Sequence, residues 1–178
     1  KEKELANVRL TSMGFIFQQM HMLKNLSIMD NILLPAYQAG KEGRTRQEIN
    51  GYCLELMKKL GISEVAENDI TEVSGGQLQR ACICRSLINQ PKILFADEPT
   101  GALNRSSSED VMQELKKLNE EGTTIMLVTH DMKVAAKCSR ILYIVDGNIK
   151  GELRMEEEGI EERLRERRLN QWLIEMGW

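Results

Sequence analysis

Three short runs of apolar residues along the chain have the pattern of β-strands. They cover residues 11 to 17, Ile93 to Ala96, and Thr124 to Thr129. The runs from Ile93 to Ala96 and from Thr124 to Thr129 are typical of strands buried on both faces of a parallel sheet, and residues 11 to 17, with Met13, Phe15, Ile16 and Phe17, indicate a further strand. We therefore expect such a sheet, with Gln18 at the carboxyl end of its first strand.

Between the first two runs, apolar positions recur at helical spacing. The pattern extends from Ser27 to about Asn89, and Tyr52, Leu56 and Leu60 illustrate its i, i+4, i+8 periodicity. A polar stretch from Gly40 to Gln47 predicts a loop between two of these helices. The segment therefore indicates a helical region between two strands.

After the second strand, Ser108 is expected to cap a helix that ends at Gly122. Asp146 and Gly147 form a dipeptide typical of a β-hairpin turn, and the strands that they join are expected at a sheet edge. The alternation of strands and helices predicts an α/β fold with a parallel, doubly wound core.

The C-terminal tail combines dense mixed charge with the apolar pattern of an amphipathic helix. Its apolar positions are Ile160, Leu164, Leu169, Trp172, Leu173 and Met176. The polar face is not predominantly basic, which favours packing on the chain's own domain or on a partner over membrane anchoring.

An acidic pair, Asp97 and Glu98, follows the second strand directly. Open α/β sheets place ligand sites at the carboxyl ends of strands, and Pro99 stops this strand because it has no amide hydrogen. One carboxylate of such a pair can hold Mg²⁺ while the other orients or deprotonates an attacking water. The plainer alternatives are that Asp97 caps the next turn and that Glu98 is a solvated acid.

The segment VSGGQLQR, residues 73 to 80, predicts a helix N-terminus that favours an anion. Ser74 is a good N-cap, and Gly75 and Gly76 allow a phosphate to approach the main chain closely. The first amides of a helix and its dipole favour negative charge. Taken alone, Ser-Gly-Gly is also typical of an ordinary loop-to-helix junction.

These segments, in this order, resemble the nucleotide-binding domain of ABC transporters. VSGGQ (73–77) is similar to the LSGGQ signature, ILFADE (93–98) to the Walker B strand, and GALN (101–104) to the D-loop. GFIFQ (14–18) resembles the Q-loop, and LVTHD (127–131) resembles the strand end that carries the switch histidine. Within the family, the chain looks most like the branch of macrolide exporters, lipoprotein-release ATPases and antimicrobial-peptide transporters.

The resemblance implies a P-loop NTPase-like parallel sheet flanked by helices, with an inserted α-helical subdomain. Residues 1–18 would then carry the Q-loop strand of the ATPase core, and residues 19–89 the helical subdomain that ends in the signature helix. Residues 90–152 would complete the core with Walker B, D-loop and switch histidine, and residues 153–178 would form the helical tail.

The same resemblance implies ATP and Mg²⁺ as cofactors and assigns roles to individual residues. Asp97 binds Mg²⁺ through water, and Glu98 is the general base that polarises the attacking water. Gln18 contacts Mg²⁺ or that water, and His130 reaches the γ-phosphate. Taken alone, a histidine after a buried strand is more often a satisfied core residue, so the role of His130 depends on the flanking motifs.

Two protein partners are also implied by the resemblance. Ser74, Gly75, Gly76 and Gln77 would cap the ATP held by a second copy of the chain, in a head-to-tail dimer with two composite sites. An integral-membrane permease would receive the resulting motion, with the ATPase in the cytoplasm on the inner face of the membrane. The segment from His21 to Met29 could receive the permease or belong to the subdomain core.

Two departures from the family pattern change the expectations. The G-x-x-x-x-G-K-[ST] phosphate loop is missing, since the only Gly-Lys pair, Gly40-Lys41, is followed by Glu42. We therefore interpret the chain as the C-terminal portion of a longer protein, expect it to bind ATP weakly or not at all by itself, and expect an unpaired hydrophobic sheet edge. Asn104, among the nucleotide-contacting positions, replaces the D-loop aspartate, which predicts altered coupling between the two sites with hydrolysis retained.

Composition narrows the function classes. With 24 basic and 27 acidic residues, the net charge of −3 gives no electrostatic footprint for nucleic acid. The four cysteines, Cys53, Cys82, Cys84 and Cys138, lack metal-like spacing and are expected to be small buried residues. No apolar run approaches the roughly 20 residues that span a bilayer, so a link to a membrane would pass through a partner.

Three alternatives stay open. The chain could be a truncated, non-hydrolysing module with a binding or regulatory role, or a cell-division type of ABC ATPase without transport. ABC ATPases of DNA repair or translation share the motifs, but the long coiled coils, zinc inserts or second ATPase half that they usually carry do not occur in this sequence.

Overall fold

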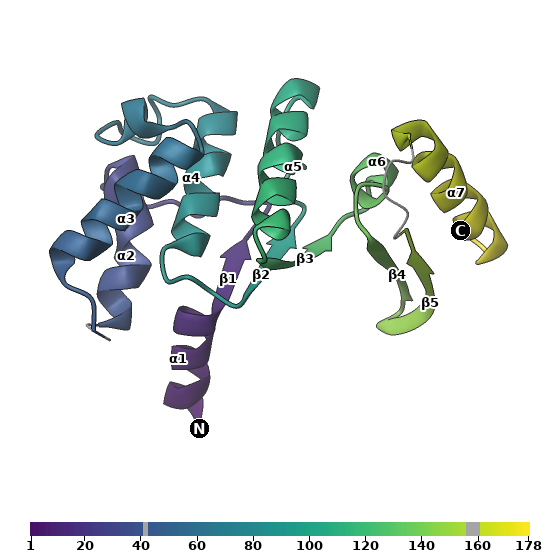
Figure 1. The fold of residues 1–178 in the computed structure, drawn as a ribbon, viewed down its shortest axis with the longest axis horizontal. Coiled ribbons are helices and arrows are strands. Elements are labelled where there is room, and N and C mark those ends of the chain that lie inside the picture. Colours follow the sequence, from purple (N-terminus) through teal and green to yellow (C-terminus); the bar gives the residue numbers. More distant parts are fainter. Residues whose placement is uncertain (41–42, 156–160) are drawn as a thin grey trace. The chain divides into compact units, whose positions relative to one another are not determined.

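The computed structural model describes residues 1–40, 43–155 and 161–178. The chain divides into two compact units, Lys1–Val128 and Thr129–Trp178 (Figure 1). This division groups the C-terminal helix with the hairpin that precedes it. Lys41 and Glu42, which belong to the expected 40–47 loop, lie outside the described residues, as does Ile160.

The first unit is built on a three-stranded parallel sheet with the order β1-β2-β3. Its strands are β1 (Met13–Ile16), β2 (Ile93–Asp97) and β3 (Thr124–Val128). All three lie where the apolar runs predict strands, so the α/β class with a parallel sheet is confirmed. The first strand is shorter than expected, because helix α1 (Glu2–Ser12) continues through residues 11 and 12.

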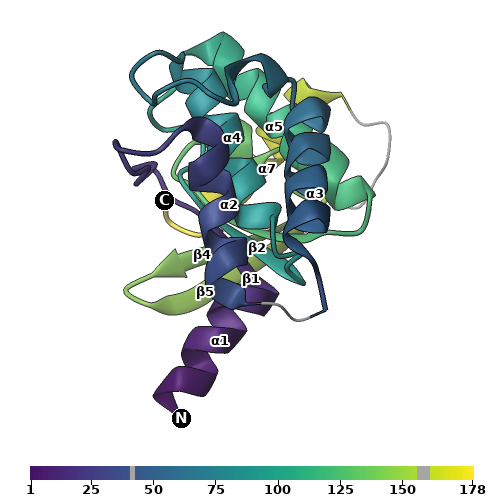
Figure 2. The ribbon, with the colours of Figure 1, turned by 90° about the vertical axis from the view of Figure 1, so that its left-hand side faces the viewer.

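Three helices connect β1 to β2 and form the helical region that the periodicity predicts. They are α2 (Ile28–Ala39), α3 (Arg46–Lys59) and α4 (Gly75–Leu87), with a short 3-10 turn η1 (Ser63–Val65) after α3. As Figure 2 shows, α2, α3 and α4 lie together, and each contacts the other two. Each begins at a hydroxyl N-cap, respectively Ser27, Thr45 and Ser74, whose oxygen accepts an amide hydrogen of the first turn.

Helix α5 (Arg105–Glu120) follows β2 and begins earlier than the sequence predicts. Its N-cap is Asn104, whose Oδ1 accepts from the Ser107 amide at 2.9 Å. Ser108, the expected cap, lies within the first turn and donates its hydroxyl to the Asn104 carbonyl. The expectation was wrong because the extended backbone at Asn104, which sets the cap, does not show in the run of polar residues. The helix ends, as predicted, just before Gly122.

The two faces of the three-stranded sheet differ in burial. Leu94 and Ala96 are almost fully buried on the face that α4 and α5 cover, whereas Phe95 on the opposite face is half-buried. Strand β3 alternates between exposed and half-buried residues, and 54% of Val128 is exposed. The expectation of strands buried on both faces is therefore wrong for the described chain, because only one face is covered by its helices.

The second unit contains α6 (Met132–Ala135), an antiparallel hairpin of β4 (Arg140–Val145) and β5 (Asn148–Arg154), and α7 (Glu162–Glu175). Asp146 and Gly147 form the predicted turn, and both have the positive φ that a tight hairpin requires. The hairpin forms a separate two-stranded sheet.

Helix α7 packs on its own unit, as the sequence favours. Leu169 and Leu173 join Ala136 and Met155 in a buried core. Leu164, expected on the apolar face, is 51% exposed, because the neighbouring Arg165 takes the inward position. Within the described residues, no helix is both long and apolar enough to cross a membrane.

Candidate functional site

Three of the predicted site residues meet at the carboxyl ends of β1 and β2. Asp97 is the exposed last residue of β2, half-buried Glu98 follows it, and Gln18 lies just beyond β1. A methyl group added at Gly101 would lie 3.1 Å from Gln18 Nε2 and 3.5 Å from Glu98 Cβ. The structure therefore brings the glutamine and the glutamate close to the same point beside Gly101.

The backbone at Glu98 is held in an uncommon conformation. Its φ is +45°, in the left-handed region that residues other than glycine rarely adopt. The Glu98 amide donates to the Val128 carbonyl at 2.9 Å, and its carbonyl accepts from the Gly101 amide at 3.0 Å. Such conformations persist where the surroundings over-determine them, and they cluster at functional sites. Neighbouring main chain thus fixes where the side chain of Glu98 leaves the strand end.

The expected anion-binding helix terminus is formed by α4. Ser74 Oγ accepts from the Gln77 amide at 3.2 Å, and Gln77 Oε1 accepts from the Ser74 amide at 2.9 Å, which together make a capping box. The prediction that Ser74 caps the helix is confirmed. The amides of Gly75 and Gly76 belong to the first turn, where helix geometry provides no intrahelical acceptor.

The two glycines of this turn also serve packing within the chain. A methyl group at Gly76 would lie 3.2 Å from Ser107 Oγ, and one at Gly75 would lie 3.6 Å from Leu103 Cδ2. The first turn of α4 therefore packs against the start of α5, next to the cap Asn104. Sequence reasoning assigned the glycines to phosphate approach alone and missed this contact, which has no local sequence signal.

His130 is described in the second unit. It is exposed and lies directly before Asp131, the N-cap of α6, whose Oδ1 accepts from the Lys133 amide at 2.8 Å. The strand that precedes it is not a buried one, and His130 is exposed, so it does not belong to a core.

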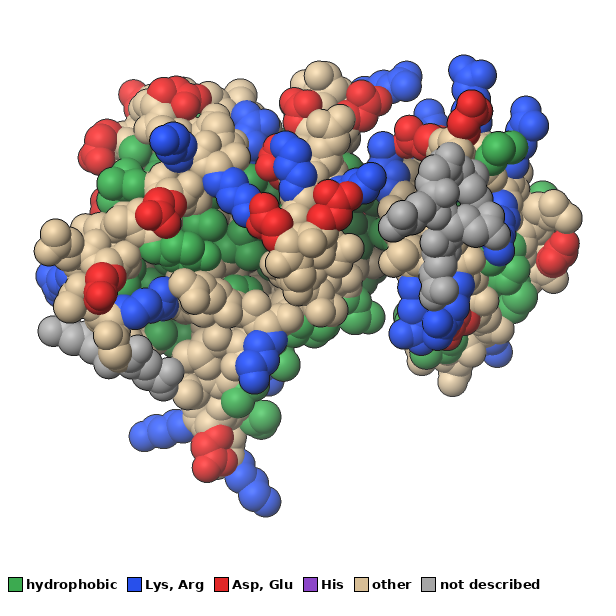
Figure 3. Space-filling view, in the orientation of Figure 1, with side chains coloured by type: hydrophobic (Ala, Val, Ile, Leu, Met, Phe, Trp, Pro, Cys, Tyr) green, Lys and Arg blue, Asp and Glu red, His purple; other side chains and the backbone are tan. Residues whose placement is uncertain are grey.

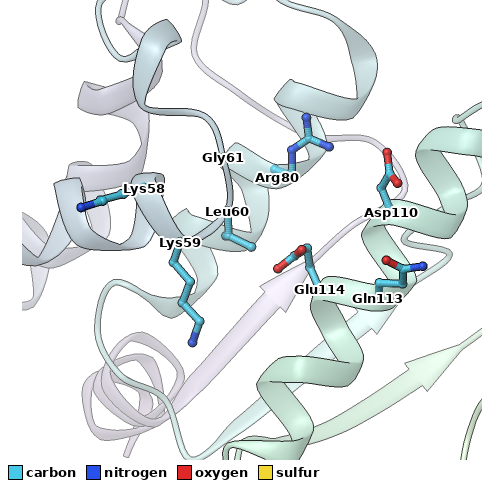
Figure 4. Close-up of a pocket in the computed structure, with 8 residues that line it drawn as sticks. All are labelled: Lys58, Lys59, Leu60, Gly61, Arg80, Asp110, Gln113 and Glu114. Carbon is cyan, nitrogen blue, oxygen red and sulfur yellow. The ribbon is translucent and has the colours of Figure 1, made fainter.

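An open pocket of about 250 Å³ lies between the end of α3, helix α4 and helix α5 (Figure 4). Its charged lining residues have both signs: Lys58, Lys59, Arg80, Asp110 and Glu114. Lys59 pairs with Glu121 and Glu114 pairs with Lys117, so much of this charge is compensated locally. On the face shown in Figure 3, acidic and basic side chains are likewise interspersed over the helices of the first unit. The pocket lacks the single-sign charge that would select a nucleotide.

Two polar side chains missed by sequence reasoning hold the segment that follows Gln18. Arg85, on α4, donates to the carbonyls of Met20 and His21, and Asn31, on α2, bonds to main-chain groups of residues 23–27. Arg85 shares the helical spacing of the apolar residues on α4, and a charged residue in an apolar register was the signal that could have revealed it.

A protein-family model described as "ABC transporter" matches residues 3–101. The chain belongs to the ABC transporter family. The ABC transporter resemblance drawn from the motifs is thus confirmed, and the match spans Gln18, the signature helix and the acidic pair.

Two relatives illustrate how much of a family member the chain covers. The chain is 44% identical over 154 residues to the macrolide export ATP-binding/permease protein MacB of Psychrobacter cryohalolentis, covering 86% of this chain and 23% of that protein. It is 46% identical over 149 residues to the uncharacterized ABC transporter ATP-binding protein YknY of Bacillus subtilis, covering 84% of this chain and 64% of that one. The chain therefore spans less than two thirds of the length of either relative.

Solved structures agree with the fold. The ATP-binding cassette MJ0796, in a dimeric post-hydrolysis state bound to ADP and Pi, superposes with a TM-score of 0.77 at 36% identity, covering 88% of this chain and 68% of that one. A second dimeric structure of MJ0796 gives the same TM-score at 38% identity. The flanked parallel sheet of an ABC ATPase cassette is thus shared by this chain.

Proposed function

We propose that the chain is part of the ATP-hydrolysing subunit that powers an ABC-type membrane transporter. The observation that carries the proposal is that Gln18 and Glu98 lie close together beside Gly101, at the carboxyl end of the parallel sheet. The chain's membership of the ABC transporter family supports the same function. The capped N-terminus of α4 supplies a second, separate element suited to an anion.

The residues present fit Mg²⁺ and a triphosphate. Mg²⁺ prefers oxygen ligands and is usually held by one or two carboxylates together with waters and substrate phosphates. Asp97 offers an exposed carboxylate and Gln18 an amide oxygen at the same strand ends. When bound, Mg²⁺ would neutralise charge on the phosphates. The 178 residues contain no G-x-x-x-x-G-K-[ST] segment, so the proposal assigns the main β- and γ-phosphate contacts to a segment outside this sequence.

Within that frame, the chain's own residues have distinct tasks. Glu98 orients the attacking water and accepts its proton, and the left-handed backbone fixes its carboxylate at the strand end. Gln18 helps to position the same water, and His130 contacts the γ-phosphate. Ser74 to Gln77 cap the nucleotide of a second copy, a role supported by the dimeric state of the MJ0796 structures.

The relatives support the proposed membrane partner and transport class. The fusion of ATP-binding and permease parts named for MacB supports a permease partner and a position on the cytoplasmic face of the membrane. We propose export of peptides, antibiotics or lipidated substrates as the transport class. A truncated regulatory module and a cell-division ATPase remain the alternatives.

Glu98→Gln in the complete gene product, assayed with its permease, tests the proposal. We expect ATP turnover to fall at least about 100-fold, since general-base catalysis contributes that much or more. Glu109→Gln is the matched control, because Glu109 is an exposed carboxylate on α5 paired with Arg105. Full turnover by Glu98→Gln would sink the proposal, and so would an equal loss in both variants.

Asn104→Asp tests coupling between the two sites. Aspartate caps helices about as well as asparagine, so the N-cap of α5 is kept and only charge is added. We expect altered ATP cooperativity with hydrolysis retained. Cooperativity and turnover equal to those of the wild type in the Asn104→Asp variant would refute a coupling role.

A further inference from the structure

Arg85 lies in the last turn of the signature helix α4 and grips the main chain that follows Gln18. Its Nη2 donates to the Met20 carbonyl at 2.7 Å and its Nη1 to the His21 carbonyl at 2.9 Å. The thiol of Cys82, one turn earlier on α4, approaches the same Met20 carbonyl at 3.5 Å. Hydrogen bonds from a guanidinium are charge-assisted and roughly twice as strong as neutral ones.

The backbone conformation beside these acceptor carbonyls is uncommon. His21 has a φ of +46°, in the left-handed region, and its ring contacts the Phe17 ring edge-on with centroids 5.8 Å apart. A histidine in this conformation is uncommon and is retained where tertiary contacts over-determine it. The guanidinium bonds at Met20 and His21 are such contacts.

A second side chain fixes the rest of the segment. Asn31, on α2, is only 1% exposed. Its Oδ1 accepts from the Leu23 amide at 2.7 Å, and its Nδ2 donates to the carbonyls of Leu23, Leu26 and Ser27. Since α2 and α4 pack together, the main chain from Met20 to Ser27 belongs mechanically to the helical subdomain.

The segment that connects this fixed main chain to the sheet is only three residues long. Strand β1 ends at Ile16, and the three residues between it and the grip, Phe17, Gln18 and Gln19, are all exposed. On the β1 side of the helical subdomain, a displacement of α4 relative to the sheet would therefore be taken up within these three residues. Gln18 is the middle one, two residues from the Arg85 acceptor Met20.

We propose that Arg85 is a positioning residue that transmits movement of the signature helix to Gln18. The inference rests on the proposed function, because it gives Gln18 a task at the attacking water. Arg85 acts through the main chain at Met20 and His21. A second copy's ATP, bound at the N-terminus of α4, would thus change the position of Gln18 in the site of the same chain.

Arg85→Lys in the complete gene product with its permease tests this link. Lysine keeps the charge but has one nitrogen, so it cannot reproduce the two-nitrogen fork. We expect kcat to fall about tenfold with KM for ATP changed less than about twofold, and ATP cooperativity to weaken. Arg165→Lys is the control, because Arg165 also donates to three carbonyls but in the second unit. It should leave kcat and cooperativity unchanged.

A double-mutant cycle shows whether Arg85 acts through Gln18. In a Gln18→Ala background, Arg85→Lys should cost less than about twofold more, because coupled residues are not additive. A full, additive loss in that background overturns the proposal, as does wild-type kcat and cooperativity in Arg85→Lys alone. Hydrogen exchange at residues 19–23 needs no activity: faster exchange in Arg85→Lys supports the grip, and unchanged exchange contradicts it.

The proposed function fails separately. If Glu98→Gln retains turnover in the same assays, the ATPase assignment is wrong. If Glu98→Gln is inactive while Arg85→Lys behaves as wild type, only the role of Arg85 is wrong.

Discussion

The two sheets of this protein are covered in different ways. The three-stranded sheet of the first unit buries one face under α4 and α5 and leaves apolar side chains half-exposed on the other, where Phe15 stacks on Phe95 with ring centroids 5.5 Å apart. In the second unit, helix α7 packs on the hairpin. The Trp172 ring contacts the Tyr143 ring edge-on, with ring centroids 6.3 Å apart. The position of a residue relative to these faces should therefore decide the effect of its substitution.

The largest effect is expected at Gly14, where the covered face comes closest to α4. A methyl group there would lie 2.5 Å from the main-chain oxygen of Ser86, which cannot move by a side-chain rotation. We expect Gly14→Ala to destabilise the first unit by about 3 kcal/mol or more, the upper range of overpacking effects. Urea unfolding followed by hydrogen exchange in β1 and in the hairpin would measure each unit separately.

Gly151→Ala is the matching change in the second unit. A methyl group there would lie 2.8 Å from Trp172 and 2.9 Å from Met176, but both neighbours are side-chain atoms. The methionine can rotate away, so the expected cost is about 1 kcal/mol. A larger loss for Gly151→Ala than for Gly14→Ala would break the comparison.

The two faces of the first sheet provide the next contrast. Leu94→Ala, on the covered face with 0% exposure, should cost about 3 kcal/mol, whereas Val128→Ala, with 54% exposure, should cost about 0.5 kcal/mol or less. Urea unfolding midpoints of residues 1–178 would measure both values. Repeating the pair in the complete gene product sharpens the result: a cost above about 1 kcal/mol for Val128→Ala would show that the open face is covered there.

Arg165 tests which contacts hold the second unit together. Its Nε, Nη1 and Nη2 donate to the carbonyls of Ala136, Met155 and Cys138 at 2.7, 3.1 and 2.9 Å. We expect Arg165→Ala to destabilise the unit by about 2 kcal/mol, since bonds to charged groups contribute about that much. Hydrogen exchange in α7 reports the loss. The exposed neighbour Arg163→Ala is the control and should change stability by less than about 0.5 kcal/mol.

The smallest differences concern pH, and they have opposite signs for buried thiols and for a carboxylate that accepts hydrogen bonds. Burial raises the pKa of Cys53 and of Cys82 from 9.0 to about 11 in the first unit. Their contribution is complete below pH 9 and is lost as pH rises through about 11. In the second unit, hydrogen bonds from Arg140 and then Arg154 lower the pKa of Glu152 from 4.5 to about 2. That contribution is complete above pH 4.5 and is lost as pH falls toward 2.

Urea unfolding measured across pH, with hydrogen exchange followed separately in each unit, would check the direction of both stability changes. The first unit should weaken between pH 9 and 11, and the hairpin below pH 4.5. Replacing Cys82 by alanine and Glu152 by glutamine should flatten the respective profiles. Profiles that keep their slope after these replacements would contradict the assignment.

Much of this arrangement could be predicted from the sequence, since it depends on neighbouring residues. The capped helix at Ser74, the hairpin turn at Gly147 and the three parallel strands all follow from local patterns that the structure confirms. The cap at Asn104 could not be chosen among the polar residues near it, because the choice depends on where the chain leaves the turn that begins at Glu98.

Long-range contacts account for the remaining differences. Arg165 displaces Leu164 from the inward face because three carbonyls, far away in the sequence, need a donor. Arg85 is likewise explained by acceptors more than 60 positions earlier in the chain. The exposure of β3 depends on which elements cover the sheet. The residue pattern within the strand cannot predict that coverage.

The central claim is that a composite site joins Glu98 of one copy to the Ser74 helix of another, and intersubunit complementation tests it directly. Two complete gene products, one with Glu98→Gln and one with Ser74→Arg, are each expected to be inactive alone. A purified mixed dimer should regain ATP turnover, to about half of wild type if its sites act independently, because one of its two sites then combines an intact Glu98 with an intact signature helix. If each site lies within a single chain, the mixed dimer stays inactive, and the claim is wrong.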